Sequence, residues 1–176
     1  MKRKGLPERA GQRPRTTPTN PHTQLDQNPE EVLVRELAQK VFALSDVEER
    51  PSAISVPGAR ALWLRDEVPA GPQEAFMIGR EFAHIHPLPD GSLHAALPPE
   101  LAEEAIEKGW AEQHPVARMG FIPPNVVMIY APRTRGRSRS SPGWLRSLTV
   151  TLGDAGANRL VHKRLVGTSD GILRAR

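Results

Sequence analysis

Residues 79–115 read GREFAHIHPLPDGSLHAALPPELAEEAIEKGWAEQHP and carry the clearest structural signals in this chain of 176 residues. A Pro-Asp-Gly turn separates two apolar runs, which predicts that residues 80–86 and 92–97 pair as an antiparallel hairpin. A helix is expected to follow, beginning at Pro98-Pro99 and ending at Gly109. The rest of the domain is expected to assemble around this hairpin and helix.

The same stretch holds four of the six histidines of the chain, His84, His86, His94 and His114. Side chains two residues apart on a strand share a face, so His84 and His86 are expected on one side of the sheet together with Phe82. If the turn places His86 opposite His94, three imidazoles line that face. A register shifted by one residue would send His94 to the other face, so the cluster depends on the turn.

Further elements are expected on either side of this stretch. A helical period after Asn28-Pro29 predicts an amphipathic helix over residues 29–44. Short apolar runs between Pro- and Gly-rich loops predict strands at residues 59–64, 76–78 and 126–131. The fold class is therefore predicted to be α+β, with two layers, a mainly antiparallel sheet, an N-terminal helix and a second helix after the hairpin.

Charge and composition divide the chain into three segments. Residues 1–28 carry six basic and two acidic side chains, residues 29–131 carry eight and sixteen, and residues 132–176 carry ten and two. Residues 1–28 are also rich in Pro and poor in apolar residues, which predicts a disordered tail. We expect one domain over residues 29–133 and a basic, irregular tail over residues 134–176. The acidic middle does not favour nucleic-acid binding by the domain.

The composition also restricts the chemistry and the location. Cysteine is absent, so disulfides and thiolate chemistry are excluded, and a metal would need His, Asp or Glu ligands. No apolar run approaches the ~20 residues that a membrane-spanning helix needs. The basic start is followed by polar residues and prolines in place of the apolar core of a signal peptide. These features predict a cytoplasmic protein that does not contact membranes.

Four sequence blocks between residues 80 and 133 resemble the luciferase domain of bioluminescent fungi and its bacterial relatives. They occur in the order and at the approximate spacing of that family. The blocks are Arg80-Glu81-x-Ala83-His84-x-His86, x-Leu93-His94-x-x-Leu97, Lys108-Gly109-Trp110-x-x-x-His114-Pro115 and Tyr130-Ala131-Pro132-Arg133. The fungal enzymes oxidise a hydroxylated pyrone with molecular oxygen and emit light without ATP. They also carry an N-terminal membrane-anchoring segment that this sequence lacks.

The resemblance implies an oxidoreductase-like domain that acts on a small enolic or phenolic substrate, with O2 as a second substrate. A shared domain does not transfer the substrate itself, and light emission is less expected here than another oxidation or a binding role. A non-catalytic module that binds a small ligand in the same pocket is the alternative. Nucleic-acid binding through the basic ends is a third and less favoured reading.

The three hairpin histidines allow three chemical interpretations. His84, His86 and His94 have a spacing suited to a metal site with three nitrogen ligands, for zinc or iron. A polar pocket in which they only form hydrogen bonds is favoured over this, because the sequence fixes no carboxylate beside them. In a third interpretation one histidine is a general base that deprotonates an acidic enol, and the resulting anion reacts with oxygen directly.

Other polar residues are assigned more weakly. His114 either braces the turn before Pro115 or completes the histidine pocket, and it is counted with the candidate catalytic residues. Glu81 is expected to point away from the histidine face and to be a surface or salt-bridge residue. His22 and His162 lie in the predicted tails and are discounted.

Three residues of the blocks are candidate substrate-binding residues. Arg133 would hold an anionic substrate oxygen, although a pairing with the acidic middle of the chain is the simpler expectation. Tyr130 lies in an apolar strand and is more typical of a core residue with a tethered hydroxyl. Trp110 follows the second helix and is expected to pack back against it.

The chain departs from the family after Arg133. It continues TRGRSRSSPGWLRSLTVTLGD, with no acid before Asp154, whereas the relatives continue with an acidic amphipathic helix. A solvated basic tail and an RNA-contacting segment are two interpretations. Our preferred hypothesis is a frameshift, because codons shifted by one base can encode a helix of the family's kind. Resequencing of the locus tests this, and a confirmed intact frame would remove the idea.

Overall fold

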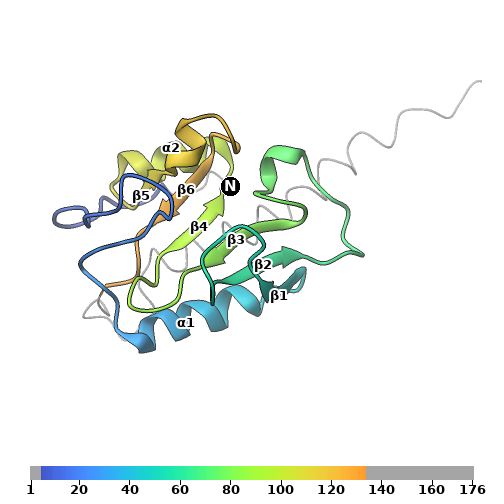
Figure 1. Ribbon diagram of the computed structural model, residues 1–176, viewed down its shortest axis with the longest axis horizontal. Coiled ribbons are helices and arrows are strands. Elements are labelled where there is room, and N and C mark those ends of the chain that lie inside the picture. Colours follow the sequence, from blue (N-terminus) through green and yellow to red (C-terminus); the bar gives the residue numbers. More distant parts are fainter. Residues whose placement is uncertain (1–4, 134–176) are drawn as a thin grey trace, which may run out of the picture.

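The computed structural model describes residues 5–133, which form a single antiparallel sheet with helices packed against it (Figure 1). The six strands lie in the order β1-β2-β3-β4-β6-β5, and each neighbouring pair is antiparallel. The predicted α+β class with a mainly antiparallel sheet is confirmed. The strands are Val47–Pro51 (β1), Arg60–Leu64 (β2), Glu81–Ile85 (β3), Leu93–Ala96 (β4), Ala111–Gln113 (β5) and Val126–Ile129 (β6), and the helices are Glu31–Phe42 (α1), Gln73–Ala75 (η1, a 3-10 turn), Pro99–Glu107 (α2) and Pro115–Arg118 (α3).

One face of the sheet packs against α1 and α2 and forms the apolar core. The helix predicted over residues 29–44 is observed as α1, which buries Leu37 and Val41 in this core. The helix predicted after the hairpin is α2, which buries Leu101 and Ala105. In both helices the buried residues are four positions apart, so they lie on one side of the helix and face the sheet.

The histidine hairpin forms as predicted, with a different pairing. β3 and β4 are antiparallel neighbours, and His84 lies directly opposite His94. The expected partner of His94 is His86, which lies two residues after His84 and just beyond the end of β3. A shift of two residues keeps every side chain on its face, so His84 and His94 still share one side of the sheet. They lie on the face opposite the apolar core.

A β-bulge in β3 changes which side chains accompany the histidines. Leu62 pairs with Ala83, but the next residue of β2, Trp63, pairs with Glu81, so Phe82 is an extra residue in the ladder. One extra residue reverses the alternation of side chains beyond it. Phe82 therefore packs in the apolar core and Glu81 lies on the histidine face. The predictions that Phe82 shares the histidine face and that Glu81 points away from it are both wrong for this reason.

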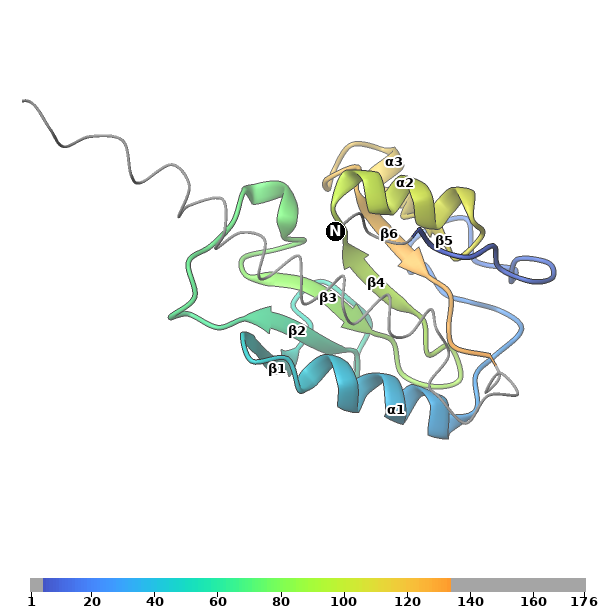
Figure 2. The same ribbon diagram turned by 180° about the vertical axis from the view of Figure 1, so that it is seen from behind.

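The segment before α1 lacks helices and strands but packs on the domain. In Figure 1 and Figure 2 it runs beside α2 and β5 before it reaches α1. The Trp110 indole N–H donates a hydrogen bond to the Pro7 carbonyl (2.6 Å), and the Ala131 N–H donates to the Gln24 side-chain oxygen (3.0 Å). The predicted disorder therefore does not apply to residues 5–28, because hydrogen bonds to distant segments hold them.

No helix within residues 5–133 has the length and apolar character needed to cross a bilayer. The basic tail over residues 134–176, including the hypothesis of a frameshift and the discounted His162, lies outside the described residues.

Candidate functional site

A cavity of about 210 Å³ opens on the histidine face of the sheet. Five of the six histidines of the chain line it, and they come from the N-terminal segment, the hairpin and the start of α3. Both polar and apolar side chains line this small, partly open space. The lining residues are Asn20, Pro21, His22, Ile54, Ser55, Val56, Met77, His84, His86, His94, His114, Val116 and Ile122.

A buried carboxylate stands behind the first of these histidines. Glu81 is fully buried, and its Oε1 lies 2.8 Å from Nδ1 of His84. The same carboxylate accepts hydrogen bonds from the Ser52 hydroxyl (2.7 Å) and the Ala53 N–H (2.8 Å). Three contacts of this kind compensate a carboxylate for the water it has lost. Glu81 also fixes the loop after β1 to β3, and this loop forms one wall of the cavity.

The contacts of Glu81, His84 and His94 set the positions of the ring protons. The Glu81 carboxylate accepts a hydrogen bond from Nδ1–H of His84, which leaves the Nε2 lone pair of the neutral ring as an acceptor. That nitrogen lies 3.2 Å from Nδ1 of His94, which therefore donates. The Nε2 lone pair of His94 is then left free, and within residues 5–133 this atom is buried without a hydrogen-bond partner.

His86 belongs to a second chain of contacts. Its Nδ1 lies 2.6 Å from Oδ2 of Asp90, and its Nε2 lies 2.9 Å from the Ser55 hydroxyl. Asp90 is the aspartate of the Pro-Asp-Gly turn, where it also accepts the N–H groups of Ser92 and Gln24. A carboxylate thus stands beside each of His84 and His86, which corrects the expectation that none does.

His22 is a pocket residue, contrary to its dismissal as part of a disordered tail. It is 1% exposed, and its Nε2 lies 2.6 Å from Oε1 of Glu112 on β5. The Nε2–H donates to this carboxylate, so the lone pair of the neutral ring is on Nδ1. Like Nε2 of His94, Nδ1 of His22 is buried and has no hydrogen-bond partner among the described residues.

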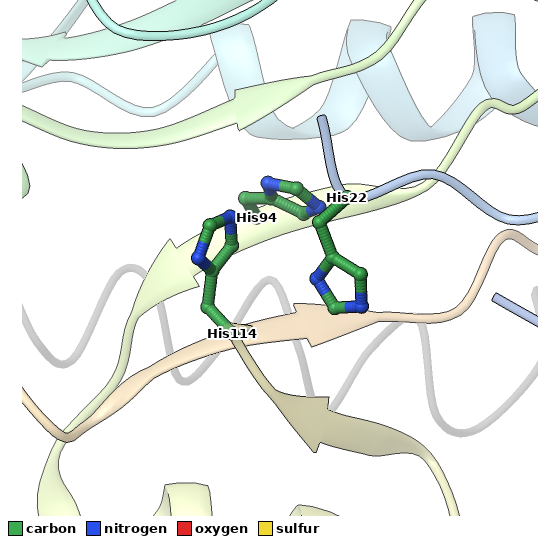
Figure 3. A group of neighbouring side chains, drawn as sticks. All are labelled: His22, His94 and His114. Carbon is green, nitrogen blue, oxygen red and sulfur yellow. The ribbon is translucent and has the colours of Figure 1, made fainter. Parts of the chain in front are cut away.

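His114 completes the pocket and also caps α3, so both interpretations offered for it describe its position. Its Nδ1 accepts a hydrogen bond from the Val116 N–H (3.2 Å), which places the proton of the neutral ring on Nε2. Figure 3 shows this second nitrogen directed toward His94. The ring of His114 meets those of His22 and His94 edge-on, with centroids 5.1 and 5.0 Å away.

Burial keeps the central imidazoles neutral. The pKa of His94 is well below its usual value, first because the ring is desolvated and then because four other histidines surround it. Desolvation also lowers the pKa of His114 to about 4. It lowers the pKa of His84 as well, although the hydrogen bond to the Glu81 carboxylate opposes this shift. At neutral pH these rings therefore offer lone pairs and N–H donors in place of positive charge.

Within residues 5–133, two groups of three histidines could hold a metal ion. His84, His86 and His94 form one of them, as predicted, and His22, His94 and His114 form the other (Figure 3). In each group the candidate ligand atoms lie within 4.8 Å of one another. Because His94 belongs to both groups, the two are alternatives around a single ring.

None of the three candidate substrate-binding residues lines the cavity. The Tyr130 hydroxyl donates a hydrogen bond to Oε2 of Glu112 (3.1 Å) and so supports the partner of His22. Arg133 binds the side-chain oxygen of Gln27 (3.0 Å) and the carbonyl of Ala10, and Trp110 packs against the apolar core. All three lie beside the N-terminal segment, whose packing the sequence did not indicate.

Comparison with known proteins identifies the hairpin region. Residues 79–136 match the family of the luciferase domain. Over 62 residues the chain is 39% identical to a luciferase of Neonothopanus nambi, and over 56 residues it is 43% identical to luciferases of Armillaria gallica and Armillaria mellea. No solved structure matches the chain significantly.

The matched part is a fraction of each protein. It covers 34% of this chain and 23% of the Neonothopanus nambi luciferase, and 31% and 21% in the Armillaria gallica comparison. It supplies four of the five pocket histidines, whereas His22 lies outside it. The segment that builds most of the histidine pocket, residues 79–136, is therefore what the chain shares with the luciferase domain.

Proposed function

We propose that this protein is an oxygen-dependent oxidoreductase that removes a proton from a small enolic or phenolic substrate in the histidine pocket. The observation that carries the proposal is the free Nε2 lone pair of His94, which is buried, faces the cavity and has no partner among the described residues. A neutral ring nitrogen placed this way can accept the proton of a substrate hydroxyl that enters the cavity, as a general base does.

The neighbours of His94 support this role. When Nε2 takes the substrate proton, Nδ1–H still donates to His84, which in turn donates to the Glu81 carboxylate. The positive charge formed on His94 is thereby stabilised by a negative charge two hydrogen bonds away. Nε2–H of His114 points toward the same space and can donate to the substrate oxygen as it becomes negative.

The deprotonated substrate is the species that would react with oxygen. An enolate carries its electron density on carbon as well as oxygen, so it can form a carbon–oxygen bond to O2, in which the carbon is oxidised and O2 is reduced. The similarity to fungal luciferases supports an oxidation of this general kind. The cavity volume of about 210 Å³ lies below the ~300–1,000 Å³ of pockets for drug-sized ligands, which favours a small substrate.

The proposal extends to a cofactor and a location. A donor set of neutral imidazoles suits zinc or iron, so these are the ions that we propose for the histidine groups, and proton removal by His94 as described belongs to the metal-free form. We further propose a cytoplasmic protein whose partners are its small substrate and O2.

Oxygen uptake with a panel of hydroxylated 2-pyrones and phenols tests the proposal. The metal-free wild-type chain should consume O2 with at least one of them, and His94→Gln should lower kcat by about 100-fold or more, because it removes the base. His162→Gln, which changes a histidine outside the pocket, is the matched control and should retain wild-type activity. Uptake that is the same in His94→Gln and wild type would contradict the assigned role.

The same panel of compounds distinguishes the proposed oxidoreductase from the alternative, a domain that binds a ligand without catalysis. A compound that binds, as measured by calorimetry, but causes no oxygen uptake in wild type would favour this alternative. Binding that is weakened in His94→Gln would then show that the pocket is still the binding site.

A further inference from the structure

We propose that His22, His94 and His114 bind one divalent first-row transition-metal ion through Nδ1, Nε2 and Nε2, respectively. This inference rests on the pocket of the proposed function and deepens it, although it does not require the oxidation itself. Two of the three nitrogens, those of His22 and His94, are buried and lack any hydrogen-bond partner among the described residues. Figure 3 shows the three rings next to one another, and their candidate ligand atoms lie within 4.8 Å of one another, so a cation between them would satisfy both nitrogens.

The opposite edges of these rings are arranged as in metal-binding histidines. His22 donates Nε2–H to Glu112, whose other oxygen accepts the Tyr130 hydroxyl. His94 donates Nδ1–H to His84, which is held by the Glu81 carboxylate. Carboxylates behind ligating histidines fix the tautomer and increase the electron density on the ligating nitrogen. The outer partners of a metal site are therefore already in place.

The predicted group of His84, His86 and His94 is less suited to a metal. Both nitrogens of His86 are already engaged, one with Asp90 and the other with Ser55. Nε2 of His84 and Nδ1 of His94 are bonded to each other. An ion in this group would break the contacts of all three rings, whereas the group of His22, His94 and His114 loses only one hydrogen bond.

That one bond is the cap of α3. To ligate through Nε2, His114 must carry its proton on Nδ1 and so give up the bond from the Val116 N–H. The ligand atoms also need to approach, because tetrahedral ligands at ~2.1 Å from an ion are about 3.4 Å apart, while those of this group lie within 4.8 Å. Rotations of the three rings would have to supply this difference.

Three protein ligands leave a fourth position, which faces the cavity. Sites with three protein ligands and one open position are typical of catalytic zinc, whereas structural sites are closed. With an ion present, the lone pair of His94 no longer takes a proton. The substrate oxygen would bind the ion as an anion and release its proton to solvent. The metal-free and metal-loaded forms would thus bind the same substrate in different ways.

Metal titration of the chelator-treated full-length chain tests the inference without any substrate. We expect one Co2+ or Zn2+ ion per wild-type chain, by calorimetry and by the visible absorption of tetrahedral Co2+. His22→Gln should weaken binding by at least about 100-fold, since it removes a ligand, and Glu112→Gln by about 10- to 100-fold, since it removes an outer carboxylate. His86→Gln is the matched control and should bind with near wild-type affinity.

The outcomes separate the possible sites. If His86→Gln loses the metal and His22→Gln keeps it, the ion belongs to the group of His84, His86 and His94, and our inference is overturned. A wild-type chain that binds no ion would overturn it as well. Thermal melting of each metal-free variant checks its fold, and Glu112→Gln keeps the test valid if His22→Gln unfolds. Oxygen uptake by the metal-free chain tests the proposed function separately, so failure of one does not imply failure of the other.

Discussion

Glu81 is a fully buried carboxylate on the histidine face of the sheet, and its contacts explain why the chain tolerates it there. It accepts hydrogen bonds from a hydroxyl, a backbone N–H and the ring of His84. A buried charge that loses such partners is costly, because no water replaces them. The residue therefore stabilises the fold and, through His84, orients the candidate base.

We expect Glu81→Gln to lower the free energy of unfolding by about 2–3 kcal/mol, because an amide presents N–H groups to donors that need an acceptor. Urea denaturation followed by circular dichroism measures this. The control is Glu49→Gln, which changes an exposed carboxylate paired with Arg60 and should cost less than about 1 kcal/mol. Equal losses in the two variants would contradict a special role for the buried carboxylate.

The histidine cluster should make the protein sensitive to acid. The pKa of His114 is lowered to about 4 in the folded chain, chiefly by burial, while an unfolded histidine titrates near ~6.5. Between pH 4 and pH ~6.5, His114 is therefore protonated in the unfolded chain and neutral in the folded chain. Stability is thus fully present above pH ~6.5 and is lost as the pH falls toward 4, by about 3 kcal/mol for this ring alone.

Urea midpoints measured between pH 7 and 4 test this expectation, and His114→Gln should show a shallower decline than wild type. The pKa values of His84 and His94 are also lowered, so part of the decline should remain in the variant. The ionised carboxylates of Asp90 and Glu112 contribute mainly below this window, because their pKa values are lowered too. A midpoint that does not change between pH 6.5 and 4 would show that the rings are not held neutral.

The individual pocket residues were only partly predictable from the sequence. His84, His86 and His94 follow from the two-residue period of a strand and a turn signal between two apolar runs. Asp90 had a usable signal, since a turn aspartate four residues after His86 returns beside it, although it was interpreted only as a turn former. His22 had none, because its contact with Glu112 joins residues 90 positions apart.

At the scale of elements, periodic segments were predictable and the exact pairing was not. The two long helices and the hairpin have clear start and stop residues, and all three are observed. β5 and α3 are too short, at three and four residues, to show a period. The bulge in β3 has no local signal either, because it depends on where β2 stops matching the ladder. It alone decides that Glu81 joins the histidines.

The tip of the hairpin is fixed by the start of α1, which makes Gly91 critical. Its φ is +63°, and a Cβ there would lie 2.6 Å from Pro29 Cγ and 2.9 Å from Val34 Cγ2. We expect Gly91→Ala to destabilise the fold by about 3 kcal/mol or more, from backbone strain and overpacking together.

Gly120→Ala is the matched control for this substitution. Gly120 also has a positive φ, +79°, but a Cβ there meets nothing within 4 Å. It should cost about 1–2 kcal/mol from the backbone alone. Comparison of the two urea midpoints isolates the packing of the hairpin against α1, and equal midpoints would show that this contact is weak.

At the scale of the whole molecule, the N-terminal segment belongs to the folded unit despite its composition. Its few apolar residues indicated disorder, but it is held by polar contacts along its length. These include Leu6 N–H to Glu104, Arg9 N–H to the Lys108 carbonyl and Gln24 N–H to Asp90. Composition measures the apolar surface that a segment can bury, and it does not report hydrogen bonds to partners that are 66 to 99 residues away.

Removal of residues 1–28 should therefore lower the melting temperature by several degrees or more, because it exposes β5 and empties one side of the pocket. Differential scanning calorimetry measures this shift. A chain lacking only residues 1–4 is the control and should melt with the full-length protein, since it keeps every contact described for residues 5–28. Identical melting of the two shortened chains would contradict a structural role for the segment.

One consequence of His22 concerns how proteins that contain the matched domain are grouped. Four pocket histidines lie inside the matched domain, but the fifth comes from a segment that the match does not include. During evolution the two parts can change separately, so two relatives with the same domain can differ in whether a histidine or another side chain enters the pocket beside His94. Annotation that rests on the domain alone would assign one activity to both, although they differ in a group that lines the cavity.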